Sequence, residues 1–195
     1  MTIRSCTFVL VVVAALAVAC DGKNPQPVGP SASPSGEGAA SSSAQARVGT
    51  TSAAEHAVSL FDACDPETFI AVGVPCTRNG GVRFDKFVEQ LTQHHSIGSW
   101  HFAPSQVNMQ VGQMLTANNR GGEAHTFTEV ANFGGGRIAF INNLVGLTTP
   151  APECAQSVDI PPGGSFSETT DEAGVEKYQC CIHPWMRAEV RITEK

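Results

Sequence analysis

The amino-acid sequence predicts an all-β sandwich or barrel that follows a short helical section. From Gly98 onward, short runs of β-type residues alternate with turn residues, and helical periodicity is absent. Many short strands separated by turns are typical of an antiparallel sandwich or barrel. The last run alternates apolar with charged residues, which indicates a half-buried edge or final strand. The expected strands cover residues 99–102, 107–111, 114–118, 125–130, 157–160, 165–170, 177–181 and 188–193.

A helix is expected before the strands. Phe84, Phe87, Val88 and Leu91 fall at positions i, i+3, i+4 and i+7, which is one face of an amphipathic helix of about three turns. This helix is expected to end near His94 and to cap one side of the strands. It belongs to an N-terminal helical extension over residues 56–97, and the β domain covers residues 98–195.

The first 55 residues predict an export signal and a tether. Arg4 precedes the uncharged apolar run 8–18, which has the length of a signal-peptide core and is too short to span a bilayer. Small residues then lead to Cys20, so residues 1–20 are similar to a bacterial lipobox in which Cys20 is lipidated; simple cleavage is the alternative. Residues 21–55 are rich in Pro, Ser, Gly and Ala and predict a flexible linker. We therefore expect a periplasmic or extracytoplasmic, lipid-anchored protein.

The composition argues against one class of partner, nucleic acids. The chain has 195 residues, a net charge of −6 and a pI of about 5.4. A nucleic-acid-binding surface needs basic side chains to neutralise phosphates, so no nucleic-acid partner is expected. A membrane contact is expected only through the lipid on Cys20.

One loop carries the candidate chemistry. Cys180, His183 and Met186 have the spacing C-x2-H-x2-M between two expected strands, and His125 begins an upstream strand. A thiolate, two imidazoles and a thioether are the ligands of a blue-copper electron-transfer site, which is trigonal with a long axial Met. Each residue alone has a structural explanation, as a core Met, a strand-edge His or half of a disulfide. Together they predict one copper ion.

The segment YQCCIHPWM resembles the ligand loop of small cupredoxins such as amicyanin and pseudoazurin. The resemblance covers residues 100–195 and implies a cupredoxin-like Greek-key β-sandwich. It also implies that His125, Cys180, His183 and Met186 bind copper. The edge of His183 would then be the electron port, beside an apolar docking patch. Trp185 beside it fits either that patch or core packing.

The sequence departs from the family pattern in three places. The residue after the first ligand His is Thr126 where an Asn is common, and its hydroxyl is a candidate substitute for the Asn hydrogen bond. Residue 181 is Cys where Thr or Ser is usual. Residues 134–154 form an apparent insertion.

Five cysteines remain after residue 20, and exported cysteines tend to pair. The spacing of Cys64 and Cys76 suits a local disulfide. Adjacent strand residues face opposite sides, so if Cys180 faces the metal, Cys181 faces away and can bond Cys154. A Cys180–Cys181 bond, or Cys181 as a competing ligand, is the alternative.

These observations predict a type 1 copper protein that carries single electrons between envelope redox partners and is not an enzyme. No catalytic residue is expected, because the four ligands saturate a single mononuclear site. Copper storage or delivery with the same ligands is one alternative. A metal-free binding domain with an oxidised Cys180 is the other.

Overall fold

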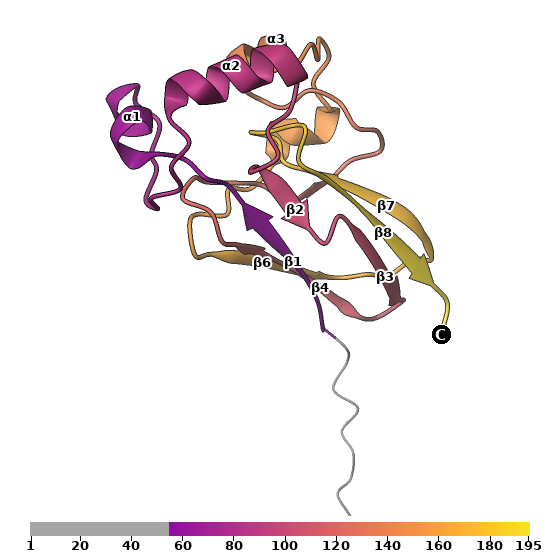
Figure 1. Ribbon diagram of the computed structural model, residues 1–195. Helices are drawn as coiled ribbons and strands as arrows, with labels where there is room; N and C mark the ends of the chain where they lie inside the picture. Colours follow the sequence, from indigo (N-terminus) through magenta and orange to yellow (C-terminus); the bar gives the residue numbers. More distant parts are fainter. Residues whose placement is uncertain (1–54) are drawn as a thin grey trace, which may run out of the picture. The chain divides into compact units, whose positions relative to one another are not determined.

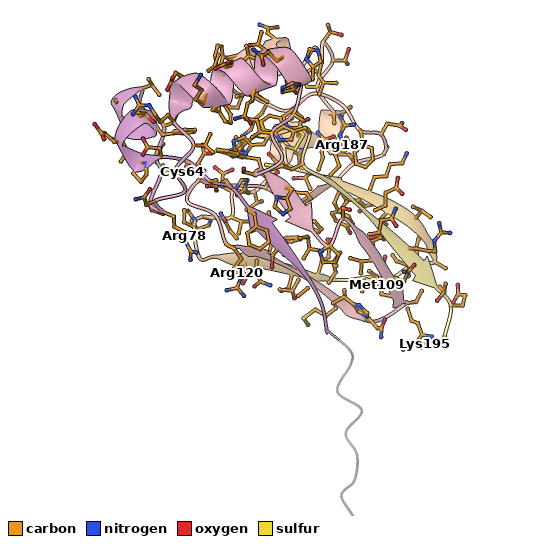
Figure 2. All side chains as sticks on the ribbon, in the orientation of Figure 1. Cys64, Arg78, Met109, Arg120, Arg187 and Lys195 are labelled. Carbon is orange, nitrogen blue, oxygen red and sulfur yellow. A yellow bond between two sulfur atoms is a disulfide. The ribbon has the colours of Figure 1, made fainter. Side chains whose placement is uncertain are left out.

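The computed structural model describes residues 55–195, which form a two-sheet β-sandwich (Figure 1). The expected all-β sandwich is confirmed. The signal segment 1–20 with Cys20, and the linker up to residue 54, lie outside the described residues. The three α-helices of residues 55–195 gather at one end of the sandwich, and the C-terminal Lys195 lies at the other (Figure 1 and Figure 2).

The first sheet has the strand order β2-β1-β4-β6. Strand β1 runs parallel to β4, whereas β2 and β6 are antiparallel to their neighbours. The four strands are β1 (Glu55–Phe61), β2 (His101–Ala103), β4 (Met114–Asn119) and β6 (Ser165–Thr169).

The second sheet has the order β3-β8-β7-β5, with β3 parallel to β8 and the other pairs antiparallel. Strand β8 is the last strand of the chain, but it lies inside the sheet between β3 and β7. The strands are β3 (Gln106–Gln110), β5 (Thr128–Glu129), β7 (Gly174–Gln179) and β8 (Arg187–Thr193).

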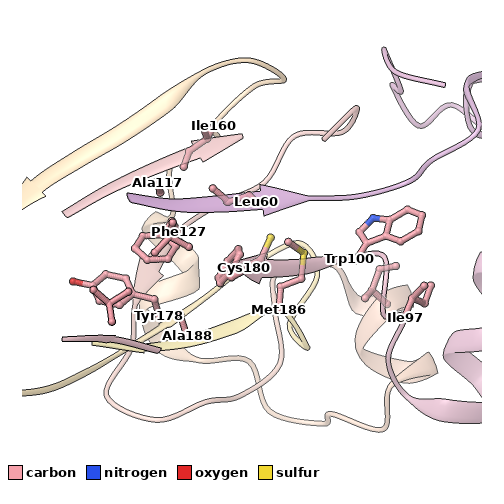
Figure 3. Close-up of a cluster of buried hydrophobic side chains, with 14 of the residues drawn as sticks. Leu60, Ile97, Trp100, Ala117, Phe127, Ile160, Tyr178, Cys180, Met186 and Ala188 are labelled. Atoms are coloured by element: carbon pink, nitrogen blue, oxygen red, sulfur yellow. The ribbon is translucent and has the colours of Figure 1, made fainter. Parts of the chain in front are cut away.

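One hydrophobic core joins the two sheets (Figure 3). Alternate residues of β1, Val58 and Leu60, point inward from the first sheet, and alternate residues of β8 point inward from the second. This alternation follows from the two-residue period of a strand. Phe127 and Tyr178 stack between the sheets with ring centroids 4.4 Å apart.

The helical end combines two helices from residues 62–100 with a third from the expected insertion. Helix α1 (Pro66–Ala71) begins at Asp65, whose carboxylate accepts a hydrogen bond from the Thr68 N–H at 2.9 Å. Helix α2 (Phe84–His94) confirms the predicted amphipathic helix and buries Phe87 and Leu91. Helix α3 (Ala139–Leu144) and the 3₁₀ helix η1 (Pro152–Gln156) fill the insertion. None of the helices in residues 55–195 is long and apolar enough to cross a membrane.

The structure corrects three expectations. Residues 55–61 are not part of a linker or a helical extension, because β1 pairs with both β2 and β4 inside the first sheet. The sandwich therefore does not begin at residue 98. Residues 157–160 do not form a strand, and His125 does not begin one, since β5 covers only Thr128–Glu129; Ile160 and His125 pair in a single bridge. Pro161 and Pro162 follow directly and cannot donate the hydrogen bonds that would extend that bridge.

Candidate metal centre

The candidate ligand loop connects β7 to β8 at the helical end of the sandwich. A backbone hydrogen bond joins the two ends of the loop, which we call its neck: the N–H of Cys180 donates to the carbonyl of Met186 at 3.0 Å. Inside the loop, the N–H of Met186 donates to the carbonyl of His183 at 2.9 Å. These bonds make a tight turn that holds all three side chains on one side of the hairpin.

The structure brings three of the predicted ligands together. The Cys180 Sγ lies 3.8 Å from Nδ1 of His125 and 3.7 Å from Nδ1 of His183. The two Nδ1 atoms lie 3.2 Å apart. All three side chains are buried, and they form one group of possible metal ligands. Three donor atoms, one from each side chain, therefore face one point.

This triangle has the dimensions of a trigonal metal site. Nitrogen ligands about 2.0 Å from a transition-metal ion and a sulfur ligand about 2.3 Å away are separated from one another by roughly 3.5–3.7 Å. The three observed separations lie close to that range. A set of one thiolate and two imidazoles suits copper, since the thiolate favours Cu(I) and imidazole accepts Cu(II). The residues present thus fit a copper ion.

Met186, the expected axial ligand, is also buried in this region. It belongs to the same core cluster as Cys180, and Figure 3 draws both sulfur-containing side chains in the core at the loop. The backbone bond between the two residues places Met186 directly opposite Cys180 across the neck of the loop.

Asp62 anchors the outer side of His125. Its carboxylate accepts a hydrogen bond from Nε2 of His125 at 2.9 Å, and also accepts the N–H groups of Gly122 and Glu123. A Cβ atom at Gly121 would lie 1.9 Å from this carboxylate, so only glycine allows Asp62 to approach. A buried carboxylate on the outer nitrogen fixes the ring and leaves Nδ1 as the donor to a metal.

The outer side of His183 is different. Its Nε2 lies 3.8 Å from Oε2 of Glu123, and that oxygen accepts a hydrogen bond from the Trp100 indole at 2.7 Å. The rings of Phe87, Trp100 and Trp185 pack around His183 with centroids 5.5–6.5 Å away. His183 is held mainly by aromatic packing.

The thiol of Cys180 and the imidazole of His125 both have shifted pKa values. Burial alone would raise the pKa of Cys180, but hydrogen bonds from the two imidazoles lower this pKa well below its ordinary value. Burial likewise opposes the charged form of His125, but Asp62 and Cys180 raise the pKa of His125 to about 9. Without metal, the group thus favours a thiolate beside an imidazolium. Since a metal ligand must be deprotonated, metal binding would release that proton.

Backbone donors also point at the thiol. The N–H groups of Thr126 and His183 each lie 3.4 Å from Sγ of Cys180. The hydroxyl of Thr126 accepts the N–H of Cys181 at 2.7 Å. Thr126 therefore links the segment that carries His125 to the ligand loop, which is the role considered for its hydroxyl in place of an Asn.

The structure contains two disulfides, Cys64–Cys76 and Cys154–Cys181, and Cys180 is the free cysteine among residues 55–195. Cys181 faces away from the thiol of Cys180 and ties the ligand loop to η1. Gly136 packs on the carbonyl of Cys181, where a Cβ atom would come within 2.2 Å. The insertion therefore braces the back of the ligand loop.

The structure corrects the expectation of an exposed imidazole edge. His183 is 2% exposed, because α2 and Trp100 cover the edge that the resemblance places at the surface. Trp185 is partly buried against the same core, so it packs on His183 and keeps one side at the surface.

Sequence reasoning missed Asp62, Glu123 and Trp100. Asp62 directly follows the alternating residues of β1, and the pair Gly121-Gly122 precedes Glu123. The alternation in residues 55–61 was the available signal for a strand that ends beside the site. No local pattern identifies Trp100 as the partner of Glu123, because that contact depends on how α2 and β2 pack.

Comparison with known proteins finds solved structures with a similar fold, but no match in sequence. No protein-family model and no curated protein matches the sequence. A Cu(I) structure of an amicyanin mutant is 22% identical, covering 50% of this chain and 78% of that one, with a TM-score of 0.36. A purple cupredoxin from Nitrosopumilus maritimus is 23% identical, covering 50% and 86%, with a TM-score of 0.36. The function of this chain is therefore inferred from its own residues.

Proposed function

We propose that this protein is a type 1 copper protein that carries single electrons. His125, Cys180 and His183 would hold the ion, and Met186 would supply a thioether as the fourth ligand. The observation that supports this most strongly is the buried triangle of one sulfur and two Nδ1 atoms, with sides of 3.2–3.8 Å. We do not propose catalysis, because four protein donors leave no open coordination position.

Copper, when bound, supplies the one-electron couple. The protein contributes fixed positions: the thiolate accepts two backbone N–H groups, His125 is held by Asp62, and His183 is held by surrounding rings. Ligands that are locked by packing and hydrogen bonds move little when the charge on an ion changes. Low rearrangement favours electron transfer over ligand exchange.

We further propose that partner proteins dock transiently over Trp185. This ring packs on His183 at 5.5 Å between centroids and is not fully buried, whereas His183 itself is covered. Weak redox encounters need only a small interface. Copper storage or delivery would instead require the ion to leave a site whose donors are almost fully buried.

An absorption experiment tests the copper proposal. Cu(II) is added to the purified protein, and the visible spectrum is recorded before and after reduction and reoxidation. We expect an intense thiolate-to-copper band that disappears on reduction and returns on oxidation. Binding without a reversible band would indicate storage, and no binding by folded protein with a free thiol would indicate a metal-free domain.

Two variants test which residue produces the absorption band. Cys180→Ser removes the sulfur with little change in volume and should abolish the band. His101→Gln changes an exposed imidazole that stacks on Phe61 and is not one of the four expected ligands, and it should leave the band unchanged. A band that survives in the Cys180→Ser protein would place the copper elsewhere.

We also propose export and a lipid anchor on Cys20. The two disulfides support an oxidising compartment, where such bonds persist. Labelling with a radioactive fatty acid tests the anchor: the natural chain should incorporate label, and Cys20→Ala should not. Equal labelling of both chains would remove Cys20 as the lipid site.

A further inference from the structure

A cavity of about 210 Å³ lies beside His183, between α2 and α3. Its walls are almost entirely apolar, and four of the lining side chains are phenylalanine rings. At its mouth, Ile138 and Phe140 are 38% and 52% exposed, so the entrance is apolar as well. The apolar lining consists of Phe69, Val74, Phe84, Phe87, Ile138, Phe140, Ile141 and Ile182.

Two polar side chains border this cavity, Glu123 and His183. Glu123 is 5% exposed, and its Oε2 is engaged by the Trp100 indole. Its other oxygen, Oε1, forms no hydrogen bond with any residue in 55–195 and is not among the fully buried unpaired atoms, so it keeps some contact with solvent at the cavity. A polar atom that is cut off from water without a partner loses its hydration without compensation. The cavity therefore combines apolar walls with one unsatisfied acceptor.

We propose that this cavity binds a small aromatic molecule that carries a hydroxyl group, of the phenol class. The ring would pack among the phenylalanines, and the hydroxyl would donate to Oε1 of Glu123. The size is sufficient, since an apolar cavity of about 150 Å³ holds benzene. Ligand sites commonly have this composition, an apolar lining with a few polar groups that fix orientation.

The hydroxyl follows from this acceptor. A purely apolar occupant would displace solvent from Oε1 without replacing the hydrogen bond, which costs more than leaving the oxygen in water. A molecule with one donor at the edge of a flat ring satisfies both the walls and the acceptor. Because His183 lines the same cavity, the occupant would lie against that imidazole. The binding step itself needs no copper.

Phenol titrated into the metal-free full-length protein tests this inference. The shifts of backbone amides are followed by NMR. We expect saturable binding at one site, with the largest shifts at Phe87, Ile141 and Ile182. Toluene, which has the ring without the hydroxyl, should bind about tenfold more weakly. No saturable binding, or toluene binding equal to phenol, would overturn the proposal.

Two variants identify the site. Ile138→Trp should fill the mouth of the cavity and weaken phenol binding at least about tenfold, whereas Val175→Trp enlarges an exposed residue on β7 and should leave it within about twofold. Glu123→Gln keeps the shape but weakens the acceptor, so it should reduce the preference for phenol over toluene. Phenol binding that is equal in Ile138→Trp and the natural chain would place the ligand elsewhere. An unchanged preference in Glu123→Gln would remove the carboxylate from recognition.

Discussion

The two imidazoles face the same thiol, but their outer nitrogens lie in different surroundings. The His125 side is polar: Asp62 accepts its Nε2 together with two backbone N–H groups, and all of these groups are paired. The His183 side is aromatic, with the nearest carboxylate oxygen 3.8 Å away and a cavity beside it. One ligand is fixed by hydrogen bonds and the other by packing.

Because of this difference, the two imidazoles are held in place by different parts of the molecule. A hydrogen-bonded ring keeps one orientation because each bond has a direction, whereas a packed ring depends on the volume of its neighbours. The sandwich and β1 therefore set the His125 side. Helix α2 and Trp100 set the His183 side and cover the imidazole, and Phe69 of α1 packs behind them.

The largest expected effect comes from removing the ring that packs the aromatic side. Phe87 is buried between Trp100, Trp185 and Phe69. Phe87→Ala should lower the free energy of unfolding by about 4 kcal/mol, through lost burial and the cavity left behind. Urea unfolding with the disulfides intact measures this change.

Phe140→Ala is the matched control for this prediction. Phe140 is exposed at the mouth of the cavity, so its removal should change the free energy of unfolding by less than about 0.5 kcal/mol. Equal losses in both variants would mean that α2 is not the element that holds the His183 side.

The sequence predicted the polar chemistry of the site better than its surroundings. The spacing of Cys180, His183 and Met186 is local, because a short turn brings all three together whatever surrounds the loop. The amphipathic face of α2 is local as well. The covering of His183 by Phe87 and Trp100 was not predictable, since it depends on contacts between residues far apart in the sequence.

Strand β1, which leads to Asp62, was also not predictable from local sequence. Its apolar residues, Val58 and Leu60, alternate correctly for a strand, but they follow a long segment without apolar periodicity. The pairing of β1 with β4, which ends near Asn119, places Asp62 beneath Gly121 and Gly122. A long-range parallel pairing of this kind leaves no local pattern, so Asp62 was missed.

Replacing each of the two carboxylates by an amide should have unequal effects on stability. Asp62→Asn places an NH₂ group or a neutral oxygen opposite three buried donors and should cost about 2–3 kcal/mol of unfolding free energy. Glu123→Gln, which affects one indole hydrogen bond, should cost about 1 kcal/mol or less. Both are measured by urea unfolding at neutral pH. If Glu123→Gln costs more than Asp62→Asn, the polar side of the site has been assigned to the wrong carboxylate.

The smallest expected effect is a pH dependence of the polar side. Burial would raise the pKa of Asp62, but hydrogen bonds from His125 and from the backbone N–H groups of Glu123 and Gly122 lower it from 3.8 to about 2. The unfolded chain therefore binds this proton more tightly than the folded one. The stabilisation by Asp62 is complete above the unfolded pKa and is lost as pH falls from about 4 through 2, by at most about 2 kcal/mol. Unfolding free energies of the natural protein and of Asp62→Asn, measured between pH 5 and 2, should converge as pH falls. Two curves that stay parallel would show that folding does not lower the pKa of Asp62, and the hydrogen bonds to its carboxylate would then not favour the charge that distinguishes the His125 side from the His183 side.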